Sequence, residues 1–161
     1  MKTLIVGLFF LSLTNLITAQ NKDYLNSVNA QNNAGQIEQL QKQAAIFNIS
    51  ELESFEKNIE TTYKVTFENP NGKLVATYNN LGVILQTVEE YRNVKSTKQI
   101  IANILKSHPN WIVEGNVFKI AYSSLREPKK TLEVRLKKEK KTVTVFFNLS
   151  CKTGEILYAK N

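Results

Sequence analysis

The chain has 161 residues, of which 42% are hydrophobic, and its formal net charge is +7. This length is enough for one domain with a hydrophobic core of its own. The only cysteine is Cys151, which excludes an intramolecular disulfide, so we expect the stability of the domain to come from packing.

The first 19 residues have the pattern of a secretory signal peptide. Lys2 precedes an apolar run from Leu4 to Leu13, and the small-residue end Thr18-Ala19 predicts cleavage after Ala19. A membrane anchor is the alternative, but the run is shorter than the roughly 20 residues that a spanning helix needs. We therefore expect an exported protein, periplasmic or extracellular, that has no transmembrane span after cleavage.

Two kinds of segment follow the predicted cut. Residues 20–35 are polar and rich in Asn, which predicts a flexible leader. From residue 36 to 161 we expect a single domain. Its first apolar residues, Ile37, Leu40, Ala44 and Phe47, have helical spacing, and Ile49, Leu52 and Phe55 indicate either a second short helical turn or an irregular segment. Such a segment is expected to cover a face or an edge of a sheet.

Three strands joined by tight turns come next. Residues 63–67 alternate apolar and polar side chains, as a half-buried strand does. The turn sequence Asn69-Pro-Asn-Gly72 ends that strand, because Pro lacks a backbone donor and Asn-Gly readily adopts positive φ. A second strand around residues 74–78 ends at Asn79-Asn-Leu-Gly82. Residues 83–91 alternate poorly, which indicates a central strand or one with a bulge.

After Arg92 the hydrophobic period changes to that of a helix. Ile100, Ile101, Ile104, Leu105 and His108 have this spacing. Ser96 or Thr97 is the predicted N-cap, and Pro109 ends the helix. We expect this helix to be the main one and to lay its apolar stripe across the sheet.

The second half of the chain reads mainly as strands. Residues 118–122 form one run, and Arg126-Glu-Pro128 is expected to break it. Residues 132–136 and 143–149 both alternate, so the intervening Lys138-Glu-Lys-Lys141 predicts a long hairpin. A last strand is predicted at residues 156–158. The fold class is therefore α+β, with about six or seven antiparallel strands packed on one main helix and one sheet face partly exposed to water.

Taken together, residues 63–158 resemble the PepSY-like, β-lactamase-inhibitor-like secreted proteins common in Bacteroidetes. The likeness depends on the Asn-Pro-Asn-Gly and Asn-x-x-Gly turns and on a short helix that ends at His108-Pro-Asn-Trp111. It implies an exported α+β layer fold with a binding or inhibitory role. It brings no catalytic motif and no cofactor.

Charge is unevenly distributed along the sequence. From Arg92 onward there are fifteen basic and five acidic residues, a balance of +10. The candidate partner-binding residues are Lys129, Lys130, Arg135, Lys137, Lys138, Lys140, Lys141 and Phe146. One interpretation is a solvated face that protects strand edges from pairing. The other is a docking surface for an anionic partner. Nucleic acid is not expected, because export removes the usual target and the aromatic pattern of single-strand binders is missing.

The catalytic inventory is small. His108 is the only histidine and Asp23 the only aspartate, and no spacing of His, Cys and carboxylates fits a metal site. Glu89 and Glu90 are adjacent and should point to opposite faces of a strand. We expect an exported, non-enzymatic binding or inhibitor-like domain that engages a protein, a peptide or an anionic envelope component. The alternative is a small exported hydrolase or transferase of an unrecognised type.

Overall fold

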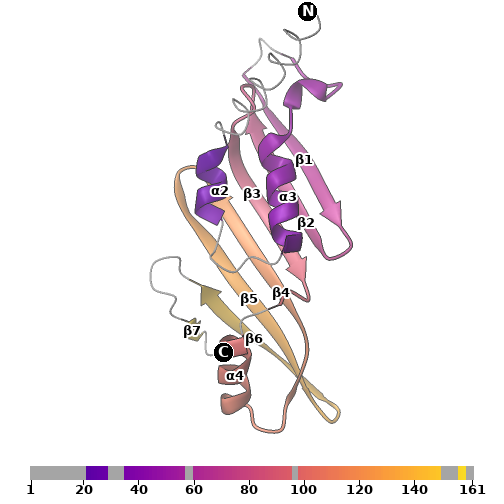
Figure 1. Cartoon of the computed structure of the whole chain (residues 1–161), viewed down its shortest axis with the longest axis vertical. Coiled ribbons are helices and arrows are strands. Elements are labelled where there is room, and N and C mark those ends of the chain that lie inside the picture. Colours follow the sequence, from indigo (N-terminus) through magenta and orange to yellow (C-terminus); the bar gives the residue numbers. More distant parts are fainter. Residues whose placement is uncertain (1–20, 29–34, 57–59, 96–97, 150–155, 159–161) are drawn as a thin grey trace, which may run out of the picture.

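The computed structural model describes residues 21–28, 35–56, 60–95, 98–149 and 156–158 (Figure 1). The helical elements are α2 (Lys22–Val28), α3 (Gly35–Ile46), the single 3₁₀ turn η1 (Ile49–Glu51) and α4 (Lys98–Ser107). The strands are β1 (Thr62–Asn69), β2 (Gly72–Asn79), β3 (Ile84–Arg92), β4 (Ile112–Ser123), β5 (Arg126–Lys138), β6 (Lys141–Leu149) and β7 (Ile156–Tyr158). The predicted α+β class is confirmed.

All the strands join one antiparallel sheet in the order in which they occur along the chain, six of them long and the seventh three residues long. The first hairpin closes where Asn69 pairs with Gly72, at the predicted Asn-Gly turn. The predicted irregularity in the third strand is also present. Thr77 pairs with Gln86 while the next residue, Tyr78, pairs with Ile84, so β3 holds one extra residue there.

The predicted break at residues 126–128 is wrong, because β5 begins at Arg126 and runs through Pro128. Proline is tolerated in a strand where no ladder bond is needed. Pro128 lies at a register shift of the β4–β5 pair, and pairing with β6 starts only at Lys130.

Helices α2 and α3 cover one face of the sheet, α3 over β1 and β2 and α2 over β4 and β5 (Figure 1). The expectation of a single main helix at α4 is therefore not confirmed. α4 lies far from α3 (Figure 1), and among the α4 side chains that the structure describes only Ile104 is fully buried in the common core. The predicted helix at Ile37, Leu40 and Ala44 is the one that packs across the sheet, with all three side chains buried.

The predicted flexible leader is wrong for residues 21–28. α2 buries Tyr24 and Val28, and the amide of Asn21 bonds the carbonyl oxygens of Ala45 and Gly82 and accepts from the N–H of Ile84. A seven-residue helix is unstable alone in water, so these tertiary contacts stabilise it.

Several predictions fall outside the described residues. They are the signal peptide at 1–19, the part of the flexible leader at residues 29–34, and the N-cap at Ser96 or Thr97. Within the described part, no helix is both long enough and apolar enough to cross a membrane.

Candidate functional site

The structure places seven of the eight candidate partner-binding residues in two groups and separates Lys130 from both. Lys137, Lys138, Lys140 and Lys141 lie together at the end of the β5–β6 hairpin, where Lys138 pairs with Lys141. Lys129, Arg135 and Phe146 lie along the sheet face that faces away from α2 and α3, where Phe146 pairs with Glu133 and is half-buried. Lys130 belongs to neither group.

Lys130 is a correction to the predicted site, because its side chain is only 4% exposed. Its Nζ donates a hydrogen bond of 2.8 Å to the carbonyl oxygen of Val28, the last residue of α2. A cation is favourable at the C-terminal end of a helix, where carbonyl oxygens lack partners. Lys130 therefore holds α2 on the sheet and is not available to a partner.

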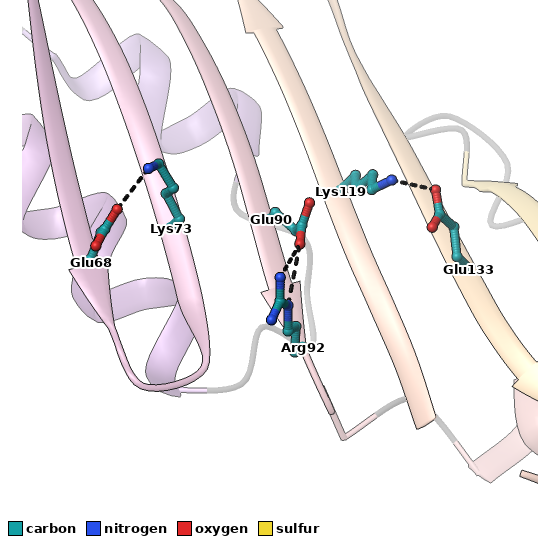
Figure 2. Close-up of polar contacts among 6 residues, drawn as sticks. All are labelled: Glu68, Lys73, Glu90, Arg92, Lys119 and Glu133. Carbon is teal, nitrogen blue, oxygen red and sulfur yellow. Dashed lines mark hydrogen bonds and ion pairs between the residues drawn. The ribbon is translucent and has the colours of Figure 1, made fainter. Parts of the chain in front are cut away.

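The open face of the sheet, defined as the face opposite α2 and α3, carries a row of alternating charges. Glu68 pairs with Lys73, Lys73 with Glu90, and Glu90 with Lys119, so the row crosses β1 to β4. Figure 2 shows the ion pairs on this face, which join Glu68 to Lys73 at 2.7 Å, Glu90 to Arg92 at 3.2 Å and Lys119 to Glu133 at 2.6 Å. Exposed pairs of this kind each contribute little to stability.

Lys119 lies between two carboxylates of the open face, since it pairs with Glu90 across the strands and forms an ion pair with Glu133. A hydrogen bond to Glu133 raises the pKa of Lys119, and the charges of Glu133 and Glu90 act in the same direction. The side chain is therefore held as a positive charge between two carboxylates.

An apolar row runs beside the charged row on the same open face. Val75 pairs with Val88, and Val88 pairs with Ala121, so the three side chains occupy neighbouring strands. Val88 is 66% exposed, although it lies on an interior strand. Val88 therefore faces solvent, whereas its neighbour Glu89 points into the core.

A shallow groove of about 520 Å³ lies on the open face where β3, β4 and β5 run side by side. Its charged lining residues are Glu90, Arg92, Glu114, Lys119, Glu133 and Arg135. The positive and negative charges are equal in number, so the groove does not select strongly for an anion or for a cation.

The opposite face holds a buried carboxylate, Glu89, whose side chain is 1% exposed. Oε1 accepts from the hydroxyls of Tyr24 at 2.9 Å and Thr87 at 2.8 Å. Oε2 accepts from Nε2 of Gln41 at 2.9 Å and from the hydroxyl of Tyr91 at 2.8 Å. The donors come from α2, α3 and β3, so this network joins both helices to the sheet.

The two tyrosines of the Glu89 network remain neutral donors. Burial raises the pKa of Tyr24 and of Tyr91, and the negative charge of Glu89 and the hydrogen bond to it raise both further. Because all four donors are neutral and the carboxylate is buried, we interpret this cluster as a structural link rather than a reaction centre.

The prediction that Glu89 and Glu90 point to opposite faces is confirmed, since Glu89 lies in the core and Glu90 on the open face. His108 follows the last residue of α4, with Nδ1 3.2 Å from the carbonyl oxygen of Ile104, which confirms its predicted place at the helix end. Among the residues that the structure describes, no three His, Cys, Asp or Glu side chains gather as metal ligands would.

Sequence reasoning missed both the open-face rows and the Glu89 network. The bulge in β3 hid them, because it changes which residues share a face: Ile84 and Glu89 are buried, whereas Val88 is exposed. The burial of Lys130 could have been predicted from strand alternation, because Lys130 lies an even number of residues before the buried Leu132, Val134 and Leu136 and so shares their face.

Comparisons with protein-family models, with curated proteins and with solved structures found no match.

Proposed function

We propose that this chain is an exported, non-enzymatic PepSY-like binding domain that holds a protein partner on the open face of its sheet. The observation that carries the proposal is the apolar row Val75, Val88 and Ala121 beside a row of alternating charges; Val88 and Ala121 are exposed and Val75 is half-buried. Apolar centres with a polar surround are characteristic of protein interfaces.

The size of the open face fits such a role. Strands lie about 4.8 Å apart and rise about 3.3 Å per residue, so six strands of about eight residues span roughly 24 by 26 Å. That gives on the order of 600 Å² before side-chain relief is counted, close to the roughly 800 Å² that each partner contributes to a standard interface.

The charges of the open face favour a protein over a polymer of one sign. Glu68, Lys73, Glu90 and Lys119 alternate across the sheet, so a uniform polyanion or polycation meets repulsion at every second strand. A folded protein can present both signs in a complementary arrangement, which improves specificity and association rate.

The available acid–base groups support a binding role over a catalytic one. Glu89 is buried and accepts four hydrogen bonds, and His108 lies against a helix carbonyl. Export rests on the signal-peptide pattern of the first 19 residues, and cleavage after Ala19 would leave Asn21, which anchors the start of α2, in the exported chain.

The test compares two substitutions of equal chemistry in a tagged chain that starts at Gln20 and so holds every described element. Val88→Glu places a charge in the apolar row, whereas Leu81→Glu places one in the β2–β3 turn, where Leu81 is 71% exposed. We expect the wild type and the Leu81→Glu variant to capture the same stoichiometric partner from envelope extract of the host. Val88→Glu should bind it at least about tenfold more weakly, which corresponds to about 1.4 kcal/mol. Equal capture by both variants would place the partner elsewhere.

A further inference from the structure

The end of the β5–β6 hairpin combines exposed cations with exposed apolar side chains. We call it the basic tip and define it by Lys137, Lys138, Lys140, Lys141, Ile112 and Val143. Ile112 is 64% exposed and Val143 is 42% exposed. The lysines at 137, 140 and 141 are exposed and Lys138 is half-buried.

The tip is compact along the strand direction. Val143 pairs with Leu136, Lys137 pairs with both Ile112 and Thr142, and Lys138 pairs with Lys141. These are three successive rows of the sheet, so their side chains lie within about 10 Å of the end of the hairpin. At physiological salt a Debye length is about 8 Å, so the four ammonium groups act together on an approaching anion.

Few carboxylates offset these cations. Glu139 occupies the turn, and Glu114 lies 3.7 Å from Nζ of Lys137. The apolar groups flank the charges on both sides of the sheet, since Ile112 shares the open face with Lys137 and Val143 shares the other face with Leu136. A surface that meets the end of the hairpin head-on would therefore contact both the cations and the apolar side chains.

We propose that the basic tip docks end-on to an anionic phospholipid bilayer, with its lysines at the headgroups and Ile112 and Val143 in the interfacial layer. The hairpin lies at one end of the molecule (Figure 1), where its cations and exposed apolar side chains can meet the anionic headgroups and the interfacial layer of a bilayer together. Each lysine near such a surface contributes about 1 kcal/mol, or about fivefold in affinity, and buried apolar groups supply the second signal that stable membrane contact requires.

This inference goes beyond the proposed function, because it concerns a different part of the molecule. Ile112 is nine residues from Ala121 along β4, so the tip and the apolar row on the open face lie at well-separated positions. A partner on the open face and a bilayer at the tip would then be bound by separate surfaces of one domain.

The test measures flotation of the chain from Gln20 onward with vesicles of phosphatidylcholine alone or mixed with phosphatidylglycerol. We expect binding only to the anionic vesicles, loss of binding at high salt, and at least about a hundredfold loss when Lys137, Lys138, Lys140 and Lys141 are replaced by Gln. The matched control replaces four exposed basic residues of α2, α3, β1 and the start of β5, namely Lys22, Lys42, Lys64 and Arg126, by Gln. This control lowers the net charge by the same amount as the tip variant does. It should weaken vesicle binding less than about fivefold, which is the effect expected for one lysine near the membrane surface.

The apolar contact has its own variant. Ile112→Ser keeps every charge and should weaken vesicle binding several-fold at low salt. The proposal is overturned if the two quadruple variants lose binding equally, if Ile112→Ser binds like the wild type, or if the protein binds soluble polyglutamate but not anionic vesicles. The last result would assign the tip to an acidic protein. None of these outcomes affects partner capture through Val88.

Discussion

Replacing Glu89 by Gln tests whether the buried carboxylate joins the two helices to the sheet. The substitution preserves shape, and one oxygen can still accept from Tyr24 and Thr87. The other oxygen becomes an amide donor that faces the amide nitrogen of Gln41 and the hydroxyl of Tyr91. The hydroxyl can rotate to accept, whereas the hydrogen bond from Nε2 of Gln41 to the carboxylate is lost.

The expected loss of stability follows from the hydrogen bonds that the substitution removes and those that it keeps. A lost hydrogen bond to a charged acceptor costs about 1.5 to 3 kcal/mol, and the two bonds that persist lose their charge-assisted part, about 1 kcal/mol together. Glu89→Gln should therefore lower the free energy of unfolding by about 2 to 4 kcal/mol. With an m-value of about 2 kcal/mol/M, the urea midpoint falls by about 1 to 2 M.

Glu90→Gln is the matched control, since it makes the same chemical change one residue along the strand. Glu90 lies on the open face, and its described ion pair is with the exposed Arg92. Its loss should cost less than about 1 kcal/mol. Equal urea midpoints for the two variants, or a Glu89→Gln variant as stable as the wild type, would show that the Glu89 carboxylate does not join the helices to the sheet.

Three further predictions concern the core and the chain terminus. Burial raises the pKa of Tyr24, Tyr78 and Tyr91 above 10.0, so the unfolded chain releases these three protons at a lower pH than the folded chain does. The free energy of unfolding should therefore fall by about 4 kcal/mol per pH unit above pH 10, which urea midpoints measured at a series of pH values would show. Tyr24→Phe should reduce that slope by about a third. Ile104→Ala should cost about 2 to 4 kcal/mol and Leu105→Ala less than about 1, because Ile104 is 1% exposed and Leu105 is 37% exposed; equal melting temperatures would contradict the packing of α4. Intact mass of the protein recovered from its host envelope should lack the first 19 residues, and a full-length mass would refute export.

The sequence predicted those parts of the fold that local chemistry determines. The Asn-Gly turn after Asn69 fixed the first hairpin, and the change of period after Arg92 located α4. The alternation around Lys138 to Lys141 located the hairpin that carries the basic tip. Each of these signals lies within a few residues of the structure that it specifies.

The parts that failed depend on contacts between distant residues. α2 has few apolar residues, and its place is set by Tyr24 with Glu89 and by Lys130 with Val28, pairs 65 and 102 residues apart. In the sequence alone, neither residue of such a pair indicates which residue it will contact. The extra residue in β3 likewise changed which side chains share a face, so the exposed position of Val88 was not visible in the pattern.

Chemical protection of position 88 shows whether a captured partner lies on the open face of the sheet. In a Cys151→Ser background, a single cysteine at Val88 or at Leu81 reports whether a captured partner covers that position, through its rate of maleimide labelling. A partner on the open face should slow labelling at position 88 by at least about tenfold, since a buried interface centre excludes solvent, and should leave the labelling rate at position 81 unchanged. Unchanged labelling at position 88 in the saturated complex would show that the open face of the sheet is not the binding surface.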